Sequence, residues 1–186
     1  MGGGHGDGYT GSAQGYTLVE LLVVVAIVAG LMVMAAPFLS RMLQDNRLIT
    51  QINRLHGTLQ FARTEAIKRG SSLTVCAAAN GLTCGGSWHD GWIVLSGTGI
   101  LRTVPKLTGN TTLSFILTAG GASDRIVFNA RGFSPNHAGT FRLCDSRGAG
   151  SAKGLITATT GRPLLATDHT GNGIAEDDTG SELTCP

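Results

Sequence analysis

Charged and aromatic side chains are both scarce in this chain of 186 residues. Charged residues make up 14% of it, against about 25% in an average soluble domain, which excludes a highly charged disordered chain. Aromatic residues make up 5%, too few to favour a stacking platform for single-stranded nucleic acid. The 28 glycines follow no Gly-X-Y period, so a collagen-like chain is excluded as well.

The sequence also lacks a strong net charge and the common motifs of catalysis. Its formal net charge of +2 gives no global field that would attract a polyanion. It contains no Walker phosphate loop and no Gly-x-Ser-x-Gly elbow. The histidines form no His-x-x-x-His pair, and we expect no cofactor.

One long apolar segment, residues 16–39, is the strongest feature that the sequence does contain. No residue from Leu21 to Leu39 is charged, which is long enough for a membrane-spanning helix. A buried core helix would usually keep a polar stripe. A secretory signal peptide would have a shorter apolar region followed by a small-residue cleavage site. The segment therefore predicts a membrane anchor over residues 16–39.

An acidic residue, Glu20, lies near the start of this apolar segment. An ionised carboxylate inside a bilayer costs several kcal/mol unless it has a partner, so an intramembrane acid indicates a function. The alternative places Glu20 at the headgroup interface, where the cost is small. Residues 1–15, just upstream, are polar and rich in glycine, as is typical of a removable leader.

The run Gly15-Tyr16-Thr17-Leu18-Val19-Glu20, followed by the apolar segment, resembles the type III signal of type IV pilins and type II secretion pseudopilins. The resemblance implies that prepilin peptidase cleaves between Gly15 and Tyr16 and that Tyr16 is then N-methylated. It also implies a role in filament assembly for Glu20 and for Pro37, which matches a helix-loosening proline of many pilins.

The family resemblance gives the Glu20 carboxylate a physical role. In an assembled filament it can pair with the N-terminal ammonium group of a neighbouring subunit, so that two charges neutralise one another in apolar surroundings. A misplaced subunit would leave the acid without a partner, and the pair would therefore help to set the register of the filament.

Residues 40–70 are predicted to continue the helix with one apolar face. Apolar residues recur there at spacings of three and four, namely Leu48, Ile52, Leu55, Leu59, Ala62 and Ala66. Pro37 removes one backbone hydrogen bond and is expected to kink or loosen the helix. Gly70, which follows Lys68 and Arg69, is a plausible C-cap.

From Ser71 onward the apolar periodicity falls to two, which predicts an antiparallel β domain over residues 71–186. The expected strands cover residues 73–78, 92–95, 101–104, 112–117, 125–129, 140–144 and 155–159. The apolar stripe of the preceding helix is expected to pack on one sheet of this domain.

Three stretches of the second half, Trp88–Leu95, Ile126–Gly132 and Gly139–Cys144, resemble the GspH/FimT family of minor pilins and pseudopilins. This resemblance implies an α+β fold of the type IV pilin kind. It also implies a single-pass protein of the bacterial inner membrane, with a periplasmic C-terminal domain, that later enters a pilus or pseudopilus. Its partners would be other pilins or pseudopilins, prepilin peptidase and the inner-membrane assembly platform.

Four cysteines, Cys76, Cys84, Cys144 and Cys185, lie in the β region without a Cys-x-x-Cys pair, which argues against a structural zinc site. Downstream of a membrane anchor they would be in the oxidising periplasm, where disulfides persist. Three pairings are open. We favour Cys76–Cys84 across the turn at Asn80-Gly81, and Cys144–Cys185 holding the tail to a strand.

Two weaker chemical signals lie in the β region. His89-Asp90 suggests a base with an orienting acid, and hence a membrane-anchored periplasmic enzyme. Adjacent residues of a strand point to opposite faces, so only a turn would bring the two side chains together. Asp168, Asn172 and Glu176 match part of a calcium loop, although Thr179 stands where an EF-hand has its bidentate glutamate. We therefore predict no enzyme and no metal, and favour a solvated acidic turn.

DNA is the alternative partner that the sequence suggests. Residues 123–167 carry six basic and two acidic side chains, and the FimT branch of the family binds DNA for natural transformation through a Gly-Arg-x-Arg motif. The matching stretch here is Gly161-Arg162-Pro163-Leu164, which lacks the second arginine and so one phosphate contact. The candidate contacts to double-stranded DNA are Arg162, Arg147 and Lys153. The alternative is that the basic residues of this region are solvated or face a neighbouring subunit.

The prediction that best joins these features is a minor pilin or pseudopilin, a structural subunit of a type IV pilus or a type II secretion pseudopilus. The sequence does not distinguish a type IV pilus from a type II secretion pseudopilus, because subunits of both filaments have the same kind of membrane anchor. A DNA-binding minor pilin of a DNA-uptake pilus is the alternative function.

Overall fold

A computed structural model describes residues 15–97, 99–118 and 120–185 of the chain. The predicted leader, residues 1–15, lies outside the described residues except for Gly15. The chain divides into two compact units, residues 1–43 and 44–186, and the long helix α1 (Leu18–Arg69) contributes to both. The second unit thus includes the part of the helix that carries the predicted apolar stripe.

Helix α1 begins and ends at residues suited to those positions. The side-chain oxygen of Thr17 accepts a hydrogen bond from the backbone N–H of Glu20 (3.2 Å), as an N-cap does. At the other end Gly70 adopts a φ of 60°, and the N–H of Ser71 donates to the carbonyl of Ala66 (3.2 Å). Gly70 is therefore a left-handed C-cap, as predicted.

Pro37 is accommodated inside α1, which continues through it without interruption. The hydroxyl of Ser40 donates to the carbonyl of Pro37 (2.9 Å). The helix before and after the proline is therefore one element.

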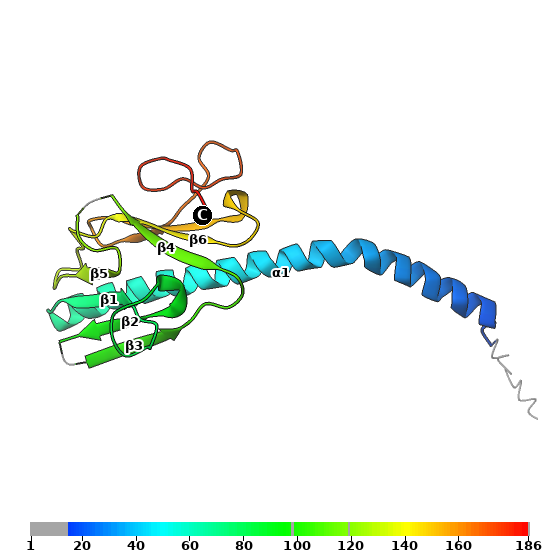
Figure 1. The fold of residues 1–186 in the computed structure, drawn as a ribbon, viewed down its shortest axis with the longest axis horizontal. Coiled ribbons are helices and arrows are strands. Elements are labelled where there is room, and N and C mark those ends of the chain that lie inside the picture. Colours follow the sequence, from blue (N-terminus) through cyan, green and yellow to red (C-terminus); the bar gives the residue numbers. More distant parts are fainter. Residues whose placement is uncertain (1–14, 98, 119, 186) are drawn as a thin grey trace, which may run out of the picture. The chain divides into compact units, whose positions relative to one another are not determined.

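The β domain contains two four-stranded antiparallel sheets, which form separate layers in Figure 1. The first has the order β3-β2-β1-β5, and its strands are β1 (Leu73–Ala77), β2 (Gly91–Ser96), β3 (Gly99–Pro105) and β5 (Arg125–Phe128). The second has the order β4-β6-β7-β8, and its strands are β4 (Thr112–Leu117), β6 (Gly139–Cys144), β7 (Lys153–Thr157) and β8 (Pro163–Leu165). Two short 3-10 helices, η1 (Trp88–Asp90) and η2 (Ala149–Ser151), lie between strands.

The predicted strands all occur, with shifts of one or two residues at several ends. The prediction missed β8, whose three residues begin with a proline and are too short to show a period of two. His89 and Asp90, which lie outside the predicted strands, belong to the single turn η1, so the strand argument against this pair does not apply to them.

The apolar stripe of α1 forms the centre of the core. All six predicted stripe residues are buried together with side chains from both sheets. The aromatic residues Trp88, Phe115 and Phe141 join this cluster, with the rings of Phe115 and Phe141 stacked at 4.4 Å and Trp88 edge-on to Phe141 at 4.9 Å. A one-sided helix that buries its apolar face against sheets explains why this part of α1 is stable in water.

Candidate functional sites

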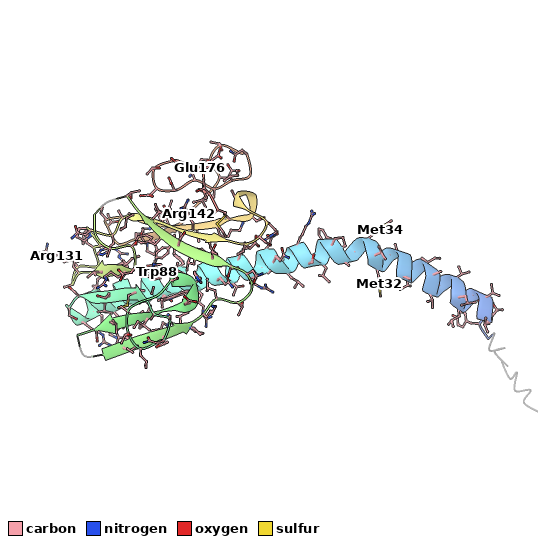
Figure 2. The ribbon with its side chains drawn as sticks, viewed as in Figure 1. Met32, Met34, Trp88, Arg131, Arg142 and Glu176 are labelled. Atoms are coloured by element: carbon pink, nitrogen blue, oxygen red, sulfur yellow. A yellow bond between two sulfur atoms is a disulfide. The ribbon has the colours of Figure 1, made fainter. Side chains whose placement is uncertain are left out.

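The first part of α1 is apolar and has no protein packed around it. All residues from Gly15 to Leu43 are exposed, including Met32 and Met34, which are labelled in Figure 2. Within the described residues α1 is the one helix that is long and apolar enough to cross a membrane. Such a surface needs lipid or other apolar helices to cover it.

The predicted processing site lies at the start of this apolar surface. Gly15, Tyr16 and Thr17 precede the helix, and the Tyr16 side chain is 85% exposed. The backbone N–H of Glu20 bonds Thr17, but no hydrogen bond or ion pair of the described residues reaches the Glu20 carboxylate. Glu20 therefore presents an exposed acid in the first turn of an apolar helix.

Two disulfide bridges fasten the β domain, and they are the pairs that the sequence analysis favours. Cys76 is joined to Cys84 across a separation of 8 residues, which holds a loop over the buried side chains of Ala78 and Ile93. Cys144 is joined to Cys185 across 41 residues, which ties the C-terminal tail to β6. Their role is structural, because both close segments onto small apolar clusters.

The pair His89-Asp90 does come together in η1, with 3.8 Å between His89 Nε2 and Asp90 Oδ2. Asp90 also accepts a hydrogen bond from Lys106 Nζ (3.1 Å), which lowers the pKa of its carboxyl group. The lysine makes Asp90 one end of an ordinary surface ion pair. No third side chain of the described residues completes a catalytic set around His89.

The acidic loop at residues 168–182 uses its carboxylates to hold its own backbone. Asp168 accepts hydrogen bonds from the N–H groups of Gly171 (2.6 Å) and Gly173 (2.7 Å). Glu176 accepts from the N–H groups of His169 (2.7 Å) and Thr170 (3.2 Å). These bonds hold the pKa values of Asp168 and Glu176 below their ordinary range.

The calcium interpretation of this loop is not supported by its geometry. The amide nitrogen of Asn172 donates to Glu182 (2.6 Å), and its oxygen accepts a hydrogen bond from the N–H of Ile174 (2.9 Å). The described residues contain no group of three or more His, Cys, Asp or Glu side chains placed to hold a metal ion. The loop is better described as an acidic turn closed by its own hydrogen bonds.

Arg147, one of the predicted DNA contacts, is committed to the fold. Its guanidinium group lies 2.7 Å from Asp45 Oδ1 of α1 and 2.7 Å from Asp145 Oδ2. The two carboxylates raise the pKa of Arg147, and its side chain is only 21% exposed. These ion pairs occupy the guanidinium group that was predicted to contact phosphate, and they bridge the helix to the loop after β6.

Arg162 is exposed and Lys153 is half-buried, and no ion pair of the described residues holds either one. Arg162 follows Gly161, whose Cα lies against the loop at Gly132: a Cβ there would come within 2.0 Å of the Gly132 carbonyl oxygen. The same carbonyl accepts a hydrogen bond from Arg63 Nε (3.1 Å). The fold thus brings Arg162 to the end of the domain that also carries Arg63 and Arg131.

A comparison with protein-family models identifies the family of the chain. The family model described as type II transport protein GspH matches residues 51–161, more than half of the sequence. The chain belongs to the GspH family. The matched range begins inside α1 and ends at Gly161, so this GspH-family core includes the apolar stripe except Leu48, and both sheets except β8.

Solved structures support the same fold for this GspH-family protein. Two crystal structures of the type IV minor pilin FimU from Pseudomonas aeruginosa (strain PAO1) are similar to it, with TM-scores of 0.55 and 0.52. The sequences are 22% and 21% identical, and the matches cover 66% and 64% of this chain and 90% and 93% of the FimU chains. The α+β pilin fold is confirmed. No curated protein matches the sequence.

Arg63 and Arg131 were not among the candidate DNA contacts predicted from the sequence of this GspH-family domain, although Arg131 was counted with the basic residues of 123–167. Arg63 looks like part of an ordinary solvated helix face, and Arg131 lies in a loop far from Arg162 along the chain. Figure 2 shows the Arg131 side chain projecting from the surface of the β domain. The Arg131 backbone N–H donates to the side chain of Asn129 (2.9 Å), which fixes the turn that carries it.

Proposed function

We propose that this GspH-family protein is a minor pilin or pseudopilin that is assembled into a type IV pilus or a type II secretion pseudopilus. The observation that carries this proposal is the exposed apolar part of α1, which continues into a helix packed on a pilin-like β domain. A bilayer would cover this surface before assembly, and the helices of other subunits would cover it in the filament.

Processing fits the same proposal. Cleavage by prepilin peptidase between Gly15 and Tyr16 would leave an α-amino group a few residues before Glu20. That peptidase and the inner-membrane assembly platform are the partners that act before other pilins do. The mature chain would be held in the inner membrane by residues 16–39, with its disulfide-linked domain in the oxidising periplasm.

The Glu20 carboxylate would select the correct position of a subunit in the filament. It has no partner among the described residues, and residues 15–40 contain no Lys or Arg that could supply one. The N-terminal ammonium group of a neighbouring subunit would supply the missing charge, since an isolated carboxylate in apolar surroundings is costly.

Replacement of Glu20 tests this function. We expect the Glu20→Ala chain to be made, cleaved and inserted into the membrane. Its level in filaments should fall at least about tenfold, because it lacks the charge that pairs with the neighbouring subunit. The amount of the chain in sheared filaments and in membranes, measured by immunoblot, gives the ratio. Leu22→Ala, on the same exposed surface, is the control for a general loss of apolar area.

Incorporation of Glu20→Ala at the level of the unaltered chain would contradict the proposal. A loss of the same size in the Leu22→Ala control would show instead that apolar area, and not the charge, limits entry into filaments.

A DNA-binding minor pilin is the second candidate, and the arginines at one end of the β domain favour it. Arg131 and Arg162 are exposed and lie on two loops that contact each other through Gly132 and Gly161. Arg63 belongs to the same end through its hydrogen bond to Gly132. Guanidinium groups spaced over a surface can contact successive phosphates of double-stranded DNA.

A salt titration of DNA binding distinguishes this function from a purely structural one. With the full chain in detergent micelles and a fluorescent duplex, we expect affinity to fall with salt, and Arg162→Ala and Arg131→Ala each to reduce the slope by about one charge. Arg102→Ala, on the edge strand β3, is the matched control and should leave the slope unchanged. Equal effects at all three positions would indicate nonspecific attraction.

A further inference from the structure

The four strands at the edges of the two sheets differ in how they are protected from pairing. β3 contains Arg102 and ends at Pro105, β5 begins with Arg125, and β8 begins with Pro163. β4 has the sequence TLSFIL, with no charge and no proline over six residues. Charges and prolines at sheet edges prevent pairing with other chains. β4 is the edge that this protein leaves unprotected.

The register of β4 with β6 shows which backbone groups face outward. The N–H of Thr118 donates to the carbonyl of Ala138 (3.0 Å), and the register pairs Ile116 with Thr140 and Ser114 with Arg142. Since the bonded pairs of an antiparallel ladder alternate, the N–H and C=O groups of Leu113 and Phe115 point away from β6.

Gly139 gives independent support for this assignment. A Cβ at Gly139 would lie 2.1 Å from the carbonyl oxygen of Ile116, so that oxygen points toward β6. Among the described residues, no hydrogen bond outside the strand ladders reaches the backbone groups of Leu113 or Phe115.

A cavity of about 340 Å³ lies along this open edge. Trp88 and His89 of η1, Leu113 and Phe115 of β4, and Ser123 are among the residues that line it. The indole N–H of Trp88 donates to the carbonyl of Ser123 (2.8 Å), and its ring packs edge-on to Phe141. These contacts hold η1 in place, so the space beside β4 is a preformed slot.

The slot carries little free charge. Asp124, its acidic lining residue, is held by two hydrogen bonds from the guanidinium of Arg125 (3.0 and 2.9 Å). The remaining lining residues are glycine, serine, threonine and apolar residues, together with His89. A segment that enters the slot would therefore be uncharged where it faces η1, with small apolar side chains toward Leu113 and Phe115.

We propose that the free edge of β4 binds an extended, uncharged segment of a neighbouring filament subunit, which adds a fifth strand to the sheet beside η1. This proposal rests on the proposed function. The unpaired backbone groups of Leu113 and Phe115 define the occupant as an extended chain, because only a strand supplies donors and acceptors at that spacing. Pairing of β4 with β4 of a second copy would close a two-fold dimer, which cannot continue into a filament.

Photo-crosslinking from the full chain tests the proposal. The probe p-benzoylphenylalanine replaces Ser114, in the native host that makes the other subunits, and the crosslinked peptides are identified by mass spectrometry. We expect a crosslink to one extended segment of another pilin-like subunit. The same probe at Thr103, on the protected edge strand β3, is the matched control and should capture that segment at a level at least about tenfold lower.

The second measurement uses a variant in which the edge of β4 carries a charge. With the probe moved to Ile116, Ser114→Lys places a charge on the open edge and should reduce the crosslink about tenfold, as expected for the loss of two net hydrogen bonds. An unchanged thermal unfolding midpoint of Ser114→Lys shows that the domain still folds. Thr103→Lys should leave the crosslink at Ile116 unchanged.

The outcomes separate the two proposals. If the chain is found in filaments but the probe at Ser114 captures nothing, captures β4 of a second copy or captures a protein that is not a filament subunit, the strand-binding proposal is overturned and the filament role stands. An unchanged crosslink in Ser114→Lys overturns it as well. If the chain never enters filaments, the proposed function itself fails.

Discussion

Gly161 shows at the scale of one residue how a motif glycine is tied to the fold. It precedes Arg162, adopts a φ of 73° and lies where a Cβ would come within 2.0 Å of the Gly132 carbonyl oxygen. Both the left-handed conformation and the close backbone contact require glycine. The glycine of the Gly-Arg stretch is therefore needed for the packing of two loops, whatever the neighbouring arginine binds.

We expect Gly161→Ala to lower the free energy of unfolding by about 2 kcal/mol or more, since a positive φ alone costs roughly 1–2 kcal/mol for a residue with a Cβ. Urea unfolding measures the change. Gly171→Ala is the matched control, because Gly171 has a φ of 79° but open space around the position of a Cβ. Equal losses in the two variants would show that the contact with Gly132 has no cost of its own.

Arg147 is a residue whose role in the fold could not be predicted from the sequence. The sequence presents it as one basic residue among several, and the fold gives it two carboxylate partners, one of them on α1. Partnership with Asp45 could not be predicted, because it depends on how the helix lies against the loop after β6. Arg162, with no such partner, stays available at the surface.

At the scale of elements, the two disulfides stabilise segments of very different length. Cys76–Cys84 closes a short loop on the first sheet, and Cys144–Cys185 closes a long segment that includes β7, β8 and the acidic loop. Leu183, next to the second bridge, is 1% exposed. The tail is thus packed as well as tethered.

The longer loop is expected to contribute more to stability. In the chain-entropy model, a loop of 41 residues corresponds to about 4 kcal/mol and one of 8 residues to about 2.5 kcal/mol. Replacing Cys144 and Cys185 together by serine should therefore lower the urea midpoint more than the same change at Cys76 and Cys84. The reverse order would mean that strain or residual structure, and not loop length, decides their contribution.

At the scale of the whole molecule, the fold shifts the pKa values of several ionisable groups. Hydrogen bonds from Arg69, Lys106 and Arg125 lower the pKa values of Glu65, Asp90 and Asp124. At Asp145, partial burial raises the pKa, but the hydrogen bonds and charge of Arg147 outweigh it and the pKa is lowered. His137 is buried at 8% exposure, and this burial lowers its pKa.

The β domain should therefore lose stability in two stages as the pH falls. Because burial lowers the pKa of His137 in the fold, the unfolded chain takes up this proton first as the pH falls, and stability is lost below about pH 6.5. The carboxyl groups with lowered pKa contribute stability above about pH 4 and lose it as the pH falls further. Thermal unfolding midpoints across pH 3–8 measure both stages. His137→Gln should abolish the first stage alone, and an unchanged first stage would rule out this histidine as its source.

The sequence by itself determined the elements of this protein that depend on local chemistry. The uncharged run at residues 21–39, the stripe of α1, the capping glycine Gly70 and seven of the eight strands follow from periodicity and backbone preference. Residue patterns in Trp88–Leu95, Ile126–Gly132 and Gly139–Cys144 were enough to indicate the family. These features need no knowledge of which segments meet in space.

Only the tertiary structure decided which side chains are free and which are used. Arg147 is held by Asp45, distant in sequence, and by Asp145, two residues away, whereas Asp168 and Glu176 bind the backbone of their own loop. Arg63 and Arg131 join Arg162 through the contact of Gly132 with Gly161. The open edge of β4 exists because the sheet ends there. Pairing between distant segments depends on register and packing of the whole domain, which no local pattern encodes.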